Sequence, residues 1–177
     1  LAQESSEIAD FWSMLQGFQT SGKCIEKAHY RIRYMKSFRP LSVKEDIEFK
    51  EARPILYLNT AAVASLFNSR NAGSTSNRSN WSTIMSYLKS HASYLGLKQD
   101  RFTILLPSGL PDYTIDIVNG EQVKKVKVNR PKALCFDYLQ LKETFGLDLE
   151  TEVVAATAKS LPEPMPRHGT PKMNLFP

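Results

Sequence analysis

The dipeptide Asn119-Gly120 stands between two runs of alternating residues, 113–118 and 121–128. Asn and Gly adopt the positive φ angles of a two-residue hairpin turn more readily than other residues do. The pattern therefore predicts a β-hairpin whose strands carry different residues on their two sides. The second strand has a basic edge, formed by Lys124, Lys125 and Lys127.

Two helices and a strand are predicted to precede this hairpin. A helix begins at Asn59 or Thr60 and ends near residue 70, a polar loop follows over 71–80, and a second helix spans 79–95. Strands are then expected at 101–106 and, after the hairpin, at 132–136. Helix, turn, helix, strand and hairpin is the element order of a winged helix. The sequence thus predicts an α+β fold with a winged-helix-like core.

Further elements surround this core. We expect an N-terminal helix at 5–20, a strand at 27–35, one or two strands within 47–58, and a helix that Asp137 caps and Gly146 ends. A chain of 177 residues with 42% hydrophobic content can bury one core. We therefore predict a single domain over 1–158, followed by an extended, proline-rich tail over 159–177.

The predicted helix at 79–95 has two unlike faces. Its apolar stripe consists of Trp81, Ile84, Met85, Leu88, Ala92 and Leu95. Its opposite face carries Thr83, Ser86, Tyr87, Ser90 and Tyr94, with Lys89 and His91 at the flanks. A face of hydroxyls without acidic residues suits close approach to DNA. The alternative is a helix face that another part of the protein covers.

Charge is spread unevenly along the chain. Residues 51–135 hold 11 Lys and Arg against 5 Asp and Glu, within a net charge of +5. A basic excess favours contact with phosphates, although surface lysines also serve solubility or protect a strand edge. The phosphate-binding candidates are Arg70, Arg78, Lys89, Lys124, Lys125, Lys127 and Arg130. The candidates for contact with base or sugar edges are Thr83, Ser86, Tyr87 and Ser90, which lack bidentate groups and so predict recognition of shape or backbone.

Catalytic and metal motifs are missing from the sequence. It has no Gly-x-x-x-x-Gly-Lys loop and no Gly-x-Ser-x-Gly elbow. His29, His91 and His168 have no carboxylate–nucleophile partner nearby in sequence, and Cys24 with Cys135 cannot build a zinc site or a disulfide framework. We expect no catalytic residue, metal or cofactor here. The free thiols favour a cytoplasmic location, and no apolar run reaches the ~18 residues that would span a membrane.

The tail ends in Lys172-Met-Asn-Leu-Phe176, which resembles the peptide that docks bacterial replication proteins on the sliding clamp. Met173, Leu175 and Phe176 match the apolar anchors of that peptide, whereas Lys172 stands where glutamine is expected. The tail therefore predicts a protein-binding segment. The alternative is a tail that folds back onto its own domain.

Four stretches together resemble a known family. They are Phe-Trp-x-x-Leu with Gly-Lys near the start, Leu-Tyr-Leu-Asn-Thr-Ala-Ala-Val-x-x-Leu-Phe at 56–67, Tyr-Leu-Lys-Ser-His-x-x-Tyr-Leu-Gly at 87–96, and Ala-Leu-Cys-Phe-Asp-Tyr-x-x-Leu at 133–141. These resemble the C-terminal domain of virulence-associated E-like, primase–helicase-type proteins of bacterial mobile elements. The resemblance implies a replication or mobilisation context, with a motor domain upstream and no activity in this piece.

The first residue, Leu1, also predicts a fragment or a processed product of a larger protein. The sequence therefore predicts a DNA-binding accessory module of a larger replication or mobilisation protein. The alternative is a protein-interaction domain that docks on a motor domain or a replisome component.

Overall fold

The structure, a computed structural model, describes residues 2–71 and 79–150. Within these ranges the fold is α+β, with helices and antiparallel sheets. The helices are α1 (Ala2–Thr20), α2 (Thr60–Asn71), α3 (Trp81–Ser90) and α4 (Tyr138–Phe145). The strands are β1 (Tyr30–Phe38), β2 (Ile47–Asn59), β3 (Tyr94–Gln99), β4 (Phe102–Thr103), β5 (Tyr113–Val118), β6 (Glu121–Val126), β7 (Val128–Asn129) and β8 (Lys132–Asp137). None of the described helices is long and apolar enough to cross a membrane.

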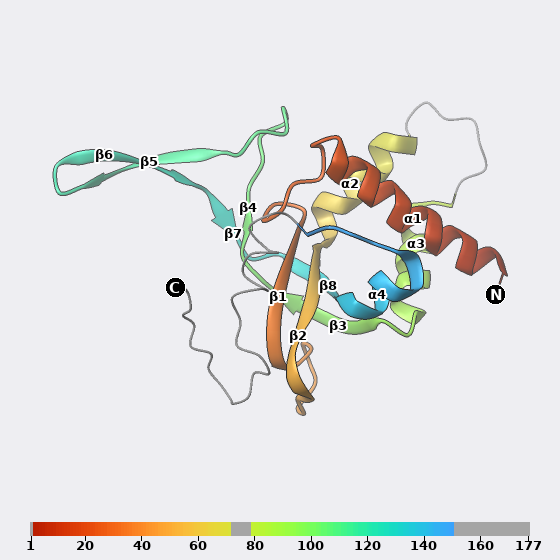
Figure 1. The fold of residues 1–177 in the computed structure, drawn as a ribbon. Helices are drawn as coiled ribbons and strands as arrows, with labels where there is room; N and C mark the ends of the chain where they lie inside the picture. The colour runs from red at the N-terminus through yellow and green to blue at the C-terminus, as the bar shows by residue number, and fades with distance from the viewer. Residues whose placement is uncertain (1, 72–78, 151–177) are drawn as a thin grey trace.

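A four-stranded antiparallel sheet in the order β1-β2-β8-β3 forms the centre of the molecule. Its two inner strands, β2 and β8, pair in a register that places Leu56 opposite Phe136 and Leu58 opposite Leu134. The four helices gather on the side of the sheet that carries these residues (Figure 1). We call this sheet with its helices the body.

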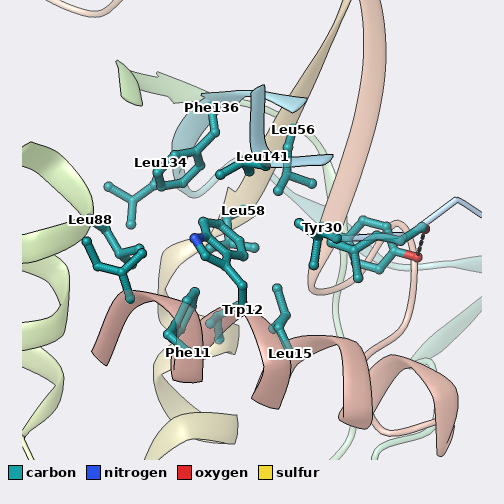
Figure 2. Packing of buried hydrophobic residues seen from close by; sticks show 14 of the residues in the cluster. Phe11, Trp12, Leu15, Tyr30, Leu56, Leu58, Leu88, Leu134, Phe136 and Leu141 are labelled. Carbon is teal, nitrogen blue, oxygen red and sulfur yellow. Dashed lines mark hydrogen bonds between the residues drawn. The ribbon is translucent and has the colours of Figure 1, made fainter. Parts of the chain in front are cut away.

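Trp12 of α1 lies at the centre of the main core and is only 1% exposed. Its ring meets Phe136 edge-on, with centroids 5.1 Å apart and planes at 90°. Figure 2 shows Phe11, Trp12 and Leu15 directed from α1 toward the strand residues. Burying a side chain of this size contributes about 1.5–3 kcal/mol or more, so α1 is held to the sheet mainly by this stripe.

The opposite face of the sheet is covered as well. Ile55 and Tyr57 of β2 form a second core with residues from three other segments, namely Phe38, Phe102, Ala133 and Cys135. The chain that leaves β1 crosses to β3, where the Leu41 N–H donates to the Leu97 carbonyl over 2.8 Å. Pro40 lies so close to Gly96 that a Cβ there would sit 2.6 Å from the proline Cβ. Only glycine fits this crossing, and its φ of +132° also favours glycine.

Strands β5 and β6 form a two-stranded hairpin that extends away from the body (Figure 1). Its turn residues Asn119 and Gly120 have φ angles of 52° and 80°, as a type I′ turn requires. Strands β4 and β7 pair where the hairpin leaves the body. We call β5 and β6 with their turn the arm.

Much of the predicted structure is confirmed. The α+β class, the helices at 5–20 and 60–70, the hairpin about Asn119-Gly120 and the strand at 132–136 are all present. Asp137 caps α4 by accepting from the Gln140 N–H, and Gly146 ends it in the left-handed conformation. The one or two strands expected within 47–58 are a single strand, β2. Pro54 is tolerated in it because the pairing with β8 begins only at Ile55, so the proline borders an open edge.

The predicted helix at 79–95 was too long. Asn80 caps α3, but the helix ends at Ser90, and His91 already has an extended ψ of 147°. Tyr94 and Leu95 belong to β3 instead and lie on opposite faces of the sheet. Tyr94 packs on Phe136, and Leu95 packs on the second core. Pairing with β8 therefore overrides an apolar spacing that fits a helix equally well.

The strand expected at 101–106 is also shorter, since β4 contains only Phe102 and Thr103. Beyond it the chain leaves the sheet, and the Ile104 N–H donates to the Lys127 carbonyl over 2.9 Å at the root of the arm. The winged-helix arrangement is not confirmed. The helix pair packs against α1 and the four-stranded sheet, while the hairpin extends from the other side of the body (Figure 1).

Candidate nucleic-acid interface

The hydroxyl face of α3 is partly covered by the rest of the body. Thr83 and Tyr87 are half-buried, whereas Ser86, Lys89 and Ser90 are exposed. The Ser90 hydroxyl lies within hydrogen-bond distance of the Ser86 carbonyl at 2.9 Å and of the Tyr87 carbonyl at 3.2 Å, both inside the helix. Of the exposed hydroxyls on this face, that of Ser90 is thus engaged within the protein, whereas Ser86 and Lys89 stay open to solvent.

Helix α1 also brings an acidic group to this face. The Glu4 carboxylate lies 3.4 Å from the Ser90 hydroxyl. A carboxylate at this position opposes the approach of a phosphate backbone. The carboxylate thus weakens the case for α3 as a helix that reads DNA, although part of its outer face is exposed.

The predicted phosphate-binding residues do not form one surface. Arg70 borders a hollow together with Asp10 and Ser13 of α1, whereas Lys124, Lys125, Lys127 and Arg130 lie on or beside the arm. Arg78 falls outside the described residues. So do the tail over 159–177 and its predicted anchors Met173, Leu175 and Phe176.

Each arm lysine has a neighbour on the arm or at its root. Lys125 pairs with Asp116 at 3.3 Å and Lys127 with Asp112 at 3.5 Å. The Lys124 ammonium lies 4.2 Å from the centre of the Tyr113 ring. Both ion pairs are exposed, and pairs of this kind contribute about 0–1 kcal/mol. Their lysines can therefore exchange a carboxylate for a phosphate at small cost.

A group of cations lies where the arm joins the body. The Arg31 guanidinium donates to the Arg101 carbonyl over 2.8 Å, and the Gln99 amide donates to the Arg130 carbonyl over 3.2 Å. Phe102 pairs with Asn129 and Gln99 with Lys132, so Arg101 lies next to Arg130 between these two pairs. We call Arg31, Arg101, Arg130 and Lys132 the root cluster.

Positive charges lie close together in the root cluster. Burial lowers the pKa of Arg31 from its ordinary value, and the positive charges of Arg33 and Arg101 act in the same direction. Asp100 opposes this shift, but its carboxylate is already engaged by Arg33 through contacts of 2.6 and 2.8 Å. Within residues 2–71 and 79–150, Arg101, Arg130 and Lys132 form no ion pair, and all three are exposed. Such a group is a suitable site for an anionic partner.

Of this cluster, only Arg130 was predicted from the sequence. Arg31 has a signal that was available, because Arg31 and Arg33 alternate with apolar residues and so share the outer side of a strand. Arg101 and Lys132 have none, since only the pairing of distant segments brings them to Arg130.

The two histidines in the described part of the chain make hydrogen bonds to neighbouring residues. The Ile25 N–H donates to Nδ1 of His29 over 2.9 Å, and burial lowers the pKa of this imidazole. The Ser93 N–H donates to Nδ1 of His91 over 3.1 Å just after α3 ends. In both rings Nδ1 lies against a backbone N–H of a neighbouring residue, so both side chains take part in local turn structure.

Both cysteines are buried and free. Burial raises the pKa of Cys24 to about 12 and raises that of Cys135 further. Thiols of this kind are poor nucleophiles. Across residues 2–71 and 79–150, no group of three or more His, Cys, Asp or Glu side chains is placed to hold a metal ion.

A hollow of about 870 Å³ lies between α2 and the loop that follows β4. Its lining includes Ala62 and Leu66 of α2 with Leu105 and Leu110 of the loop. Two polar side chains on its wall have partners inside the protein: Nδ1 of His29 accepts from Ile25, and Nδ2 of Asn59 donates to the Ala28 carbonyl over 3.0 Å. Oδ1 of Asn59 is buried and has no hydrogen-bond partner among the described residues. One orphaned acceptor does not by itself orient a substrate, so the hollow carries no functional assignment.

No protein-family model, no curated protein and no solved structure matches this chain. The resemblance to primase–helicase-type proteins stays a prediction from sequence. Any proposal about function rests on the chain's own geometry.

Proposed function

We propose that this chain is a DNA-binding accessory domain and that its binding surface is the root cluster together with the arm. The observation that carries the proposal is the gathering of Arg31, Arg101, Arg130 and Lys132 at the root of the arm without ion pairs for the three exposed members. In this proposal the arm has the role predicted for the wing of a winged helix, and it lies along the phosphate backbone. Helix α3 is not required as a reader.

The chemistry of this surface supports recognition of backbone rather than of base sequence. Guanidinium groups bind phosphate oxygens in a bidentate manner, and two of the exposed members are arginines. The arm adds lysines whose exposed ion pairs are weak. A two-stranded ribbon also has a width that the major groove admits. Within a larger replication or mobilisation protein, such a domain would hold DNA without selecting a sequence.

The test is fluorescence anisotropy of labelled single-stranded, duplex and forked DNA from about 50 to 200 mM salt. The key variant combines Arg101→Gln with Arg130→Gln. We expect weaker binding to every sequence and a salt slope lower by about 2, since each lost phosphate contact lowers it by about 1.

The control combines Lys44→Gln with Lys50→Gln, which removes the same charge from exposed positions on the β1–β2 side of the body. Its salt slope should equal that of the unchanged protein. Equal losses of affinity in both variants would mean that binding depends only on net charge and not on the root cluster. The absence of binding at about 50 mM salt would refute the proposal outright.

The arm is tested separately with Lys124→Gln, Lys125→Gln and Lys127→Gln in one variant. If the arm follows the backbone, this variant also loses affinity for all sequences and flattens the salt slope. Unchanged affinity would restrict the binding surface to the root cluster.

A second candidate function is the protein-interaction domain predicted as the alternative. The observation that favours it is the exposed apolar side of the arm, where Ile115 and Ile117 are 63% and 66% exposed. Isolated exposed side chains of this kind are common, but these lie together on one side of an element that extends from the body (Figure 1).

A further inference from the structure

The two edges of the arm are unlike each other. The outer edge of β6 carries Lys124 and Lys125, and lysines on an edge strand discourage pairing with another strand. The outer edge of β5 has the sequence Tyr-Thr-Ile-Asp-Ile-Val, with no lysine and one acidic residue. Its residue types favour strand formation. Among the described residues β5 pairs with β6 alone, so this second edge is open.

The open edge presents a regular row of backbone groups. In a hairpin closed by a two-residue turn, the pair that flanks the turn is hydrogen-bonded, and alternate residues beyond it point their N–H and C=O groups outward. Val118 and Glu121 are the flanking pair. Tyr113, Ile115 and Ile117 therefore direct their backbone groups away from β6.

The side chains of these three residues share one side of the arm. They alternate with Thr114 and Asp116 along β5, and their exposed fractions are 44%, 63% and 66% in chain order. Val126 of β6 lies opposite Tyr113 on the same side and is 42% exposed. An open edge and an apolar side thus occur on the same strand.

We propose that the β5 edge pairs with the β5 edge of a second copy of this chain. The two arms then form a four-stranded antiparallel sheet about a two-fold axis, in which Tyr113, Ile115 and Ile117 of both copies lie together on one side of the two central strands. Self-pairing is isologous, so every contact occurs twice. The arm extends clear of the body, which leaves its edge accessible to another arm (Figure 1). This proposal does not rest on DNA binding.

Charge selects one register for this pairing. Outward-facing residues must meet outward-facing residues, so the two-fold axis passes through a residue and not between two. Most of β5 is paired only with the axis at Ile115 or Asp116, whereas an axis at Thr114 or Ile117 pairs a shorter stretch. With the axis at Ile115, Tyr113 faces Ile117 of the second copy and Thr114 faces Asp116. No like charges meet, and aromatic residues pair well with β-branched ones across strands.

The neighbouring registers are disfavoured. An axis at Asp116 places the two copies of that carboxylate opposite each other. An axis at Thr114 places Asp112 opposite Asp116. Like charges in directly opposed positions destabilise a sheet.

The other edge of the arm is less suited to self-pairing. The antiparallel register centred on Lys124 places the two copies of that lysine opposite each other, and lysines on an edge strand discourage pairing with another strand. An interface made by two arms is of the small class, so the dimer should be weak and concentration-dependent.

The register gives a specific test by cross-linking. In the Ile115→Cys variant the two introduced thiols face each other in a hydrogen-bonded pair, whose Cα separation of about 5.5 Å suits a disulfide. We expect a disulfide-linked dimer on mild oxidation, seen on a non-reducing gel. The two native cysteines are buried and should not contribute.

The matched control is Gln122→Cys, which is exposed, lies on the same side of the arm and pairs with Ile117 within the arm, but belongs to β6. It should stay monomeric under the same oxidation. Equal cross-linking of both variants, or none in Ile115→Cys, would overturn the proposal.

Sedimentation velocity of the unchanged protein over a range of concentrations tests the interface without a covalent bond. We expect a dimer that grows with concentration and that Ile115→Lys removes, while Gln122→Lys, with the same added charge, keeps it. A protein that stays monomeric at every concentration, or a dimer that Ile115→Lys leaves intact, would overturn the proposal. The arm contributes no residue to either core, so both variants should keep the unfolding midpoint of the body.

Discussion

Ile55 of the body and Ile117 of the arm are both isoleucines in antiparallel strands, yet the first is fully buried and the second is 66% exposed. In the body, β2 lies between two strands and has a core on each of its faces. In the arm, β5 has a single partner and packs against no helix. The same residue type therefore stabilises the fold in one place and presents a surface in the other.

The difference also shows how each region holds its shape. The body depends on the burial of large side chains from segments far apart in sequence, such as Trp12 against Phe136. The arm depends on a local signal, the Asn119-Gly120 turn, and on pairs between neighbouring strands. A two-stranded hairpin is only marginally stable alone, so the arm takes its order from the body at its root.

The largest expected effect is at the centre of the body. Trp12→Ala should lower the free energy of unfolding by about 3–5 kcal/mol, because it removes a buried ring and leaves a cavity. Ile117→Ala in the arm should change it by no more than about 0.5 kcal/mol. Denaturant unfolding of both variants measures the contrast. A loss above about 1 kcal/mol in Ile117→Ala would mean that the arm packs against the body.

A smaller effect is expected where the chain crosses the back of the sheet. Gly96→Ala places a Cβ 2.6 Å from the Cβ of Pro40 and forces a non-glycine residue to φ +132°. We expect a loss of about 1–3 kcal/mol from overpacking and backbone strain. The control is Gly17→Ala in α1, where nothing lies within 4 Å of the new methyl group. It should gain about 0.5–1 kcal/mol, because alanine favours a helix more than glycine does.

Thermal unfolding distinguishes these opposite signs. Unchanged stability in Gly96→Ala would show that the crossing segment moves aside without cost. In that case the contact between Pro40 and Gly96 would contribute little to the stability of the protein.

The sequence predicted local structure well and tertiary pairing poorly. The cap of Asp137 and the turn at Asn119-Gly120 depend on nearby residues, and both are confirmed. The end of α3 depends on β8, which lies some forty residues further along, so an apolar spacing that fits a helix gave the wrong element at Tyr94 and Leu95. The root cluster was missed for the same reason. Arg101 and Lys132 become neighbours only when distant segments pair.

The alternation of residues in the sequence also could not predict that the arm is exposed. Alternating apolar residues predict a strand with one buried side, and Tyr113, Ile115 and Ile117 follow that pattern. In the described structure nothing covers this side, because the hairpin leaves the body at its root. Periodicity identifies which side of a strand is apolar, but it does not identify what that side contacts.

The smallest expected effect on stability concerns two carboxylates that pair with cations, one in the body and one in the arm. Asp100 in the body is buried and held by Arg33, whereas Asp116 in the arm pairs with Lys125 in the open. Burial acts to raise the pKa of Asp100, but the hydrogen bonds from Arg33 and from the Arg101 N–H outweigh it and leave the pKa below its ordinary value of 3.8. A depressed pKa in the folded state means that its stabilisation is complete above the unfolded value and is lost as the pH falls through the folded one.

Asp100→Asn should therefore lower stability by about 1 kcal/mol at neutral pH, a modest figure because Arg33 keeps 38% of its side chain exposed. The loss should shrink as the pH falls below about 4, since protonation removes the same charge from the unchanged protein. Asp116→Asn should change the stability at neutral pH by no more than about 0–1 kcal/mol, because its ion pair is exposed and the arm lies outside both cores. Chemical unfolding from about pH 3 to 7 tests both variants. A loss above about 1 kcal/mol in Asp116→Asn would contradict the separation of arm and body, and a constant loss in Asp100→Asn would assign its role to packing rather than to charge.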